Sequence, residues 1–256
     1  MRKLRLALGA ILLVGVPVTL AAAQTSVPTV AVTSAGGNIT LEPSGPLAAG
    51  PTRFTFSGRG ELNLATLRAG VTVNQLRRNL SRNPEDALRQ VFIEAAVLPS
   101  RPVTVRLRPN TTYVAAAIAG RAPAITTFTT GASSGARAPT PDARIRMVDY
   151  GFKGPKTLPR NGRIRVANAG TTFHFAIAFP LRRGVSGRQV RRAFRRPNER
   201  LIGRISRGEP VDVQGLVSQG STTDNQVRFG RRGRYAMVCF FGEHNRLGMY
   251  RVYRVR

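Results

Sequence analysis

The fold of this chain is decided by one C-terminal stretch, Gly233-Arg-Tyr-Ala-Met-Val-Cys239-Phe-Phe-Gly-Glu-His244-Asn-Arg-Leu-Gly-Met249. A β-rich run that ends at Cys239 leads into a loop with a thiol, an imidazole and a thioether at C-x4-H-x4-M spacing. These three side-chain types on one tight loop suit a soft, redox-active metal. The stretch therefore predicts a strand that carries ligands into a loop at the end of a β-sheet.

The cysteine and histidine counts concentrate the chemistry in this place. The 256 residues contain one cysteine, Cys239, and two histidines, His244 and His174. Taken singly, a buried cysteine is usually a small hydrophobe, a histidine is often structural, and Met249 could be core filler. Together they form the set of two imidazoles, one thiolate and one weak axial thioether that defines blue-copper sites. We predict one type 1 Cu(I)/Cu(II) ion held by His174, Cys239, His244 and Met249, with a degenerate, metal-free site as the alternative.

The C-terminal half reads as a β-sandwich. Seven short β-rich runs, most of them bounded by Gly, Pro, Asn or Ser clusters, predict a Greek-key arrangement. They are Arg144–Tyr150, Gly162–Asn168, Thr172–Phe179, Pro210–Val217, Asn225–Phe229, Arg234–Phe240 and Met249–Val255.

The N-terminal half resembles the C-terminal half. Leu67-Arg-Ala-Gly-Val-Thr72 aligns with Leu181-Arg-Arg-Gly-Val-Ser186, and each segment continues into a capping box that predicts a short helix. At this register Gly60 stands where His174 does. Further on, Val105-Arg-Leu107 with Tyr113 aligns with Val227-Arg-Phe229 with Tyr235, and there Ala117 stands where Cys239 does. We interpret this pattern as an internal duplication. The expected fold is all-β, with two tandem Greek-key sandwich domains that each contain a short helical insertion, the first domain lacking metal ligands.

The expected domain limits follow from composition. Residues 1–23 combine basic residues, an apolar run and Ala21-Ala22-Ala23, which predicts a signal peptide, with a retained membrane anchor as the alternative. Residues 24–130 form the first domain, 131–141 a Pro/Gly-rich linker and 142–256 the second domain. The chain is therefore expected to be exported to a periplasmic, cell-envelope or extracellular location, with no integral membrane segment after signal cleavage.

Residues 142–256 resemble the cupredoxins, the family of plastocyanin, azurin and rusticyanin. The resemblance rests on an upstream histidine, His174, and on the Gly233-x-Tyr235-x-x-x-Cys239…His244…Met249 loop. It implies that His174, Cys239 and His244 are equatorial ligands and that Met249 is the axial one. The chain departs from the family pattern at Phe175, where many members have Asn, and at Phe240, where many have Ser or Thr.

The leading functional interpretation is a one-electron carrier. By the resemblance, electrons pass through His244, with Phe240, Phe241 and Leu247 as an apolar contact patch. The alternatives are an envelope copper-binding or delivery protein and a non-redox structural module. An enzyme is not expected, because multicopper oxidases and copper nitrite reductases need several further histidines, and no small-molecule substrate is predicted.

The charge is strongly basic and unevenly placed. The formal net charge is +28, and the segment Arg182–Arg207 has ten arginines against one acid, Glu199. This segment is either an ordinary solvated face or a docking surface for an acidic redox protein or an anionic envelope component. Nucleic-acid binding is a poorer interpretation, since Phe194 is the only aromatic residue in the segment. The oligomeric state is left open.

Overall fold

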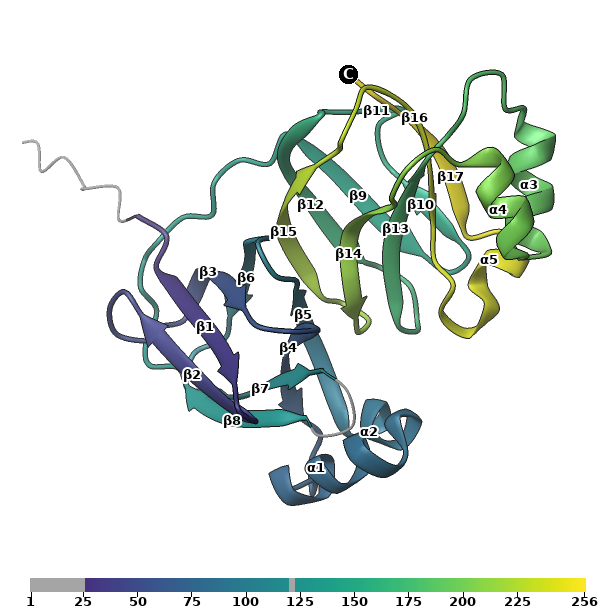
Figure 1. Ribbon diagram of the computed structural model, residues 1–256. Helices are drawn as coiled ribbons and strands as arrows, with labels where there is room; N and C mark the ends of the chain where they lie inside the picture. Colours follow the sequence, from purple (N-terminus) through teal and green to yellow (C-terminus); the bar gives the residue numbers. More distant parts are fainter. Residues whose placement is uncertain (1–25, 120–122) are drawn as a thin grey trace, which may run out of the picture.

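A computed structural model describes residues 26–119 and 123–256, so the predicted signal peptide, 1–23, lies outside the described residues. The fold is an all-β sandwich, as predicted, and Figure 1 shows two lobes with a pair of helices at the outer side of each. No helix among the described residues has the length and hydropathy needed to cross a membrane.

The strands of the N-terminal lobe are β1 (Thr29–Ala35), β2 (Asn38–Pro43), β3 (Gly50–Ser57), β4 (Glu61–Leu67), β5 (Val91–Val97), β6 (Val103–Leu107), β7 (Thr112–Ile118) and β8 (Ala124–Thr129). Those of the C-terminal lobe are β9 (Ala143–Val148), β10 (Gly151–Lys153), β11 (Thr157–Leu158), β12 (Asn161–Asn168), β13 (His174–Pro180), β14 (Val211–Val217), β15 (Thr222–Arg228), β16 (Gly233–Val238) and β17 (Tyr250–Val255).

One sheet passes through both lobes. Its strand order is β10-β9-β12-β15-β6-β3-β1-β2, and the lobes join where Thr223 of β15 pairs with Val105 of β6. Each lobe closes its sandwich with a sheet of its own, β11-β17-β16-β13-β14 in the C-terminal lobe and β5-β4-β7-β8 in the N-terminal lobe. The buried side chains between the layers form one apolar core in each lobe.

Two short helices cover the outer face of each lobe's own sheet. They are α1 (Val73–Arg82) and α2 (Pro84–Gln90) in the first lobe, and α3 (Gly187–Arg195) and α4 (Glu199–Ile205) in the second. The predicted capping boxes at Thr72 and Ser186 are both formed. The second helix of each pair was not predicted, although Asn83 and Asn198 begin these helices as N-caps.

All seven strands predicted for the C-terminal half are present, with shifted ends. The short strands β10 and β11 were missed, and β15 begins at Thr222, three residues earlier than predicted. The missed residues of β15 are polar, but Asp224 is buried against Arg165 at 2.6 Å, so an ion pair stabilises them in the sheet. The domain limits and the duplication stay predictions, and the two lobes share a sheet through β6 and β15.

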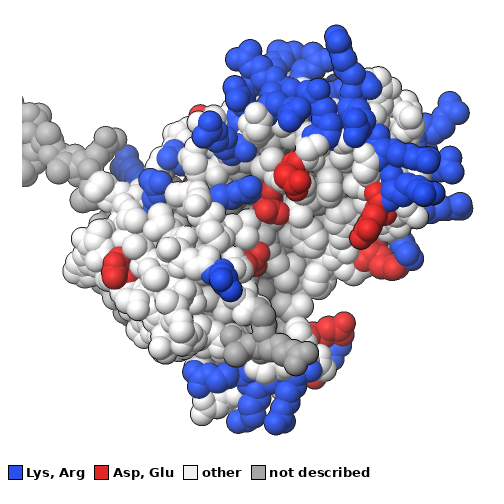
Figure 2. All heavy atoms as spheres, in the orientation of Figure 1, with Lys and Arg blue, Asp and Glu red and all other residues white. Residues whose placement is uncertain are grey.

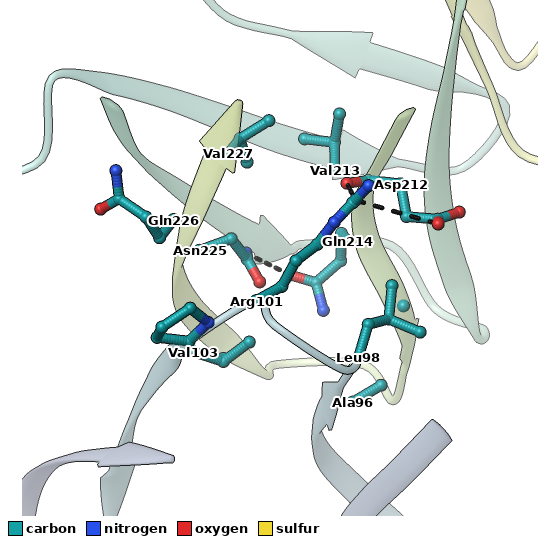
Figure 3. A pocket seen from close by; sticks show the side chains of 12 residues that line it. Ala96, Leu98, Arg101, Val103, Asp212, Val213, Gln214, Asn225, Gln226 and Val227 are labelled. Carbon is teal, nitrogen blue, oxygen red and sulfur yellow. Dashed lines mark hydrogen bonds and ion pairs between the residues drawn. The ribbon is translucent and has the colours of Figure 1, made fainter. Parts of the chain in front are cut away.

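Polar contacts join the lobes beside the shared sheet (Figure 3). Arg101, after β5, donates a hydrogen bond to the carbonyl oxygen of Asp212 in β14 and lies 3.8 Å from its carboxylate. Within the C-terminal lobe, Nδ2 of Asn225 donates to Oε1 of Gln214 at 2.8 Å. The contacts of Arg101 hold β14 against the N-terminal lobe, and the bond between Asn225 and Gln214 joins β14 to β15.

Candidate metal centre

Three predicted site residues meet at one end of the C-terminal sandwich. His174 begins β13, Cys239 follows the last residue of β16, and His244 begins the short helix α5 (His244–Leu247). Because β13 and β16 are antiparallel, with Ile177 opposite Val238, the start of one strand lies beside the end of the other. The sheet therefore brings His174 next to the Cys239 loop.

The three ligand atoms converge in the interior. Nδ1 of His174 lies 3.1 Å from Nδ1 of His244, and Sγ of Cys239 lies 3.7 Å from the same His244 atom. All three atoms lie within 4.8 Å of one another. His174 and Cys239 are fully buried, and His244 is 5% exposed.

These separations fit ligands that share one ion. Metal–nitrogen bonds of about 2.0–2.1 Å and metal–sulfur bonds of about 2.3 Å, at roughly tetrahedral to trigonal angles, separate two nitrogens by about 3.3 Å and nitrogen from sulfur by about 3.5–3.8 Å. The two separations from Nδ1 of His244 are close to these values and all three ligand atoms lie within 4.8 Å of one another, so the cluster could hold one metal ion.

Met249 lies at the same end of the sandwich. Its backbone N–H donates to the carbonyl oxygen of His244 at 2.9 Å, and its carbonyl oxygen accepts from the N–H of Cys239 at 3.1 Å. Its side chain is fully buried in the core cluster that also contains Cys239. The two backbone hydrogen bonds close the Cys239–Met249 loop and hold the backbone of Met249, the fourth predicted ligand, beside Cys239 and His244.

Asp149 orients the upstream histidine, and sequence reasoning missed it. Its Oδ1 lies 3.2 Å from Nε2 of His174, which leaves Nδ1 of His174 directed at the cluster. Thr171 donates its hydroxyl and its backbone N–H to the same carboxylate. These hydrogen bonds, those from Thr171 above all, lower the pKa of Asp149. A carboxylate behind a ligating histidine fixes the tautomer and ring orientation that a metal needs.

Gly170 provides the room for this contact. A Cβ built on Gly170 would collide with Oδ1 of Asp149 and with Nε2 of His174. Asn168 holds the turn, because its Oδ1 accepts from the N–H of Gly170 at 3.1 Å and its Nδ2 donates to the carbonyl oxygen of Thr172 at 2.8 Å. The tripeptides Asp149-Tyr-Gly and Asn168-Ala-Gly predict turns in the sequence. They do not show that the two turns lie next to each other.

Burial keeps both imidazoles neutral. It lowers the pKa of His174, an effect that the hydrogen bond with Asp149 opposes, and it also lowers the pKa of His244. Metal ligation requires a neutral imidazole with a free lone pair. The electrostatics of the site thus favour the form that binds metal.

The Cys239 sulfur has backbone donors beside it. Burial raises the pKa of the Cys239 thiol, while the backbone N–H groups of Phe175 and Phe241 act in the opposite direction. Phe175 stands where many cupredoxins have Asn. The backbone N–H of Phe175 lies beside the sulfur of Cys239. The side chain of Phe175 packs against the core.

The ligand loop has a constrained backbone and is tied to the helical insertion. Gly242, Glu243 and Gly248 have positive φ angles of 49°, 63° and 112°. Nδ2 of the buried Asn245 donates to the carbonyl oxygen of Phe194 in α3 at 2.6 Å. The residue beside His244 is thereby fixed to the end of the arginine-rich helix.

Aromatic rings surround His244. Its ring centroid lies 5.4 Å from that of Tyr150 and 5.7 Å from that of Phe241. Tyr150 is 46% exposed and Leu247 is 56% exposed, which places apolar surface next to the loop. Phe240, expected in the same patch, is half-buried like Phe241, and its ring packs against Phe179 and Phe194.

No protein-family model and no curated protein sequence matches this chain. Among solved structures it is similar to auracyanin B, with 16% identity and a TM-score of 0.30 over 47% of this chain and 93% of that one. Auracyanin from Roseiflexus castenholzii gives 14% identity and a TM-score of 0.29, over 44% of this chain and 94% of that one. A copper nitrite reductase from Nitrosomonas europaea gives 10% and 0.28, over 89% of this chain and 93% of that one. With TM-scores this low, the evidence for the fold and the site is the strand pairing and the distances within this chain.

Proposed function

We propose that this chain is an exported blue-copper protein of the cupredoxin kind that acts as a one-electron carrier. His174, Cys239 and His244 are the equatorial ligands, and Met249 is the axial ligand. The observation that carries the proposal is the convergence of two Nδ1 atoms and one Sγ atom in a buried site. Two imidazoles, a thiolate and a nearby thioether are the donor set that favours copper of this type.

The protein side chains prepare the site for electron transfer. A bound copper ion would supply a one-electron Cu(I)/Cu(II) couple. Asp149 holds the ring of His174, and the two backbone hydrogen bonds between the ends of the ligand loop hold Cys239 and Met249. A ligand set held in place by its surroundings moves little when the charge changes, which favours rapid transfer.

The burial of the ligands favours a carrier over a delivery protein. Cys239, His174 and Met249 have no exposed surface, so a receiving protein could not reach them to exchange ligands. His244 is the ligand nearest to solvent, and Tyr150 and Leu247 present apolar surface around it. We propose this surface as the point of electron entry and exit.

The basic face beside the loop is the proposed docking surface for an acidic redox protein, with an anionic envelope component as the alternative. Figure 2 shows basic side chains gathered over α3 and α4. Arg192 and Arg195 of α3 and Arg246 of α5 line an open hollow of about 540 Å³. A field of one sign steers an oppositely charged partner, and salt screens it.

We propose that the protein is not an enzyme, because its two histidines are both assigned to the one site and none remains for a second copper centre. The N-terminal lobe is then a cupredoxin-like domain without copper. Export follows from the predicted signal peptide and fits a lone thiol that a metal protects from oxidation.

Copper titration tests the proposal. Adding Cu(II) to the purified protein should give intense visible absorption from thiolate-to-copper charge transfer, and Cys239→Ala should abolish it. Met249→Leu should shift the reduction potential, whereas Met237→Leu, in the same core but outside the ligand loop, should not. A protein that stays colourless with Cu(II) would refute the proposal. Rapid loss of Cu(I) to a chelator without a reversible couple would favour the delivery protein.

A further inference from the structure

The N-terminal lobe contains an apolar cavity that the copper site does not explain. It lies between the helices α1 and α2 and the sheet β5-β4-β7-β8, and its volume is about 170 Å³. Leu76 and Leu80 of α1, Leu88 of α2 and Ile93 of β5 are among the side chains that line it. Protein interiors are close-packed, so a hollow of this size beneath a helix pair calls for an explanation.

The same place in the C-terminal lobe is filled by aromatic rings. Phe179 of β13 packs against Phe194 of α3 with ring centroids 5.7 Å apart, and Tyr250 packs against Phe194 at 5.9 Å. In the N-terminal lobe the corresponding residues are Ala65 of β4 and Leu80 of α1, which are as far apart along the chain as Phe179 and Phe194. The cavity is therefore open because an alanine and a leucine replace two phenylalanines.

One end of the cavity is polar. Glu61 and Asn63 of β4 line it, whereas β13 has Phe175 and Ile177 at the corresponding positions. Oδ1 of Asn63 is buried and has no hydrogen-bond partner within the described residues. Burial raises the pKa of Glu61 to about 7. A hydrogen bond with the side chain of Asn63 opposes this effect, and the nearby negative charge of Asp212 adds to it. One acceptor without a donor, Oδ1 of Asn63, thus lies beside the carboxyl group of Glu61 at the end of an apolar hollow.

The C-terminal lobe closes this end. A Cβ built on Gly215 of β14 would lie 3.1 Å from Oε2 of Glu61, so the backbone of β14 passes directly beside the carboxyl group. Leu216 of β14 also lines the cavity. The walls of the cavity therefore come from both lobes.

We propose that this cavity binds a small arylalkylamine, with its ring among the leucines and its ammonium group on Asn63 and Glu61. A cavity of about 150 Å³ holds a benzene ring, so this volume suits one ring with a short chain. An ammonium group has three donors and no acceptor, which matches the unpartnered Oδ1 of Asn63 and the carboxylate oxygens of Glu61. It also neutralises the buried carboxylate, whereas an anionic ligand would add a second negative charge there.

Three ring compounds that differ only in their polar group test the proposal. Benzylamine, toluene and benzoate are titrated into the full chain at pH 8, and binding is followed by calorimetry and by chemical-shift changes of the α1 and β4 amides. Benzylamine should bind about tenfold or more tightly than toluene, because hydrogen bonds to charged groups are worth about 1.5–3 kcal/mol. Benzoate should not bind. Equal binding of benzoate and benzylamine would overturn the proposal, and so would the absence of binding by all three.

Variants separate the polar end from the cavity itself. Glu61→Gln should remove most of the preference for benzylamine over toluene, while Glu85→Gln, an exposed position on α2, should leave it unchanged. Leu80→Phe should fill the hollow and abolish binding of both compounds. Ala65→Leu fills the same space from the sheet side, in case the first variant does not fold. Retained binding in a folded, filled variant would show that the compounds bind elsewhere. Copper absorption stays intact in all these variants, so failure here is distinct from failure of the copper site.

Discussion

Oδ1 of Asp149 lies 3.2 Å from Nε2 of His174, and this contact leaves Nδ1 of His174 to face His244 at 3.1 Å. An acid at the end of β9 thus determines which nitrogen of a residue in β13 is offered to a metal. The relationship makes the proposed copper site depend on a residue that is not one of its proposed ligands.

Loss of the Asp149 carboxylate should weaken copper binding. Asp149→Ala removes the acceptor behind His174 and should lower Cu(II) affinity by about 10–100-fold, since such outer partners have effects of that size. Asp149→Asn keeps an acceptor oxygen and should therefore lose less Cu(II) affinity than Asp149→Ala. The measurement is a competition titration against a copper chelator. The exposed Glu209→Gln makes the same charge change away from the site and should have no effect. An unchanged affinity in Asp149→Ala would mean that the contact does not orient the histidine.

Gly170→Ala should damage the same contact from the other side. The added Cβ would meet Oδ1 of Asp149 and Nε2 of His174, so we expect destabilisation by about 1–3 kcal/mol together with a loss of copper affinity. Gly203→Ala in α4 has open space around its Cβ and should stabilise the protein by about 0.5–1 kcal/mol. Urea unfolding of the two variants should therefore give changes of opposite sign. Equal changes would contradict the close approach at Gly170.

Two facing tyrosines should respond differently to loss of their hydroxyl groups. Tyr235 and Tyr253 are opposite each other on β16 and β17. The hydroxyl of Tyr235 donates to the carbonyl oxygen of Arg231 at 3.0 Å, whereas that of Tyr253 is buried without a partner in the part of the chain that the structure describes. Tyr235→Phe should cost about 1 kcal/mol in the free energy of unfolding, and Tyr253→Phe should be neutral or stabilising. Thermal and urea unfolding would check the pair, and a larger loss at Tyr253 would show that its hydroxyl has an unseen partner.

The stability of the protein should depend on pH through Glu61. Its folded pKa of about 7 exceeds the ordinary value of 4.5, so the folded state holds this proton more tightly than the unfolded state does. The contribution of Glu61 to stability is therefore greatest below pH 4.5, falls as the pH rises to about 7 and stays low above that. The stability gained in Glu61→Gln relative to the native protein should be larger at pH 8 than at pH 5. Glu85→Gln should show no such pH dependence, and an equal gain at both pH values would disprove the assignment.

Local pattern was enough to predict much of the fold. Alternation of apolar residues and the turn clusters identified the seven strands, and the capping boxes at Thr72 and Ser186 identified the first helix of each pair. The polar start of β15 could not be recognised, because Arg165, the partner that stabilises Asp224, lies in another strand. Likewise the packing of Phe240 against Phe194 could not be recognised, since the helix that carries Phe194 comes from a distant segment of the chain.

The sequence by itself determined which side chains could serve as ligands, since it contains one cysteine and two histidines and puts two of the three on one loop with Met249. Strand alternation and helix caps are also local properties, and they are readable because they depend on neighbours a few residues apart. Only the tertiary structure decided that Asp149 and Gly170 support His174, that β6 and β15 join the lobes in one sheet, and that a cavity remains above β4. Each of these features depends on which segments, far apart in the sequence, come together and on how closely their backbones approach. The pattern of residue types along the chain does not show that distance.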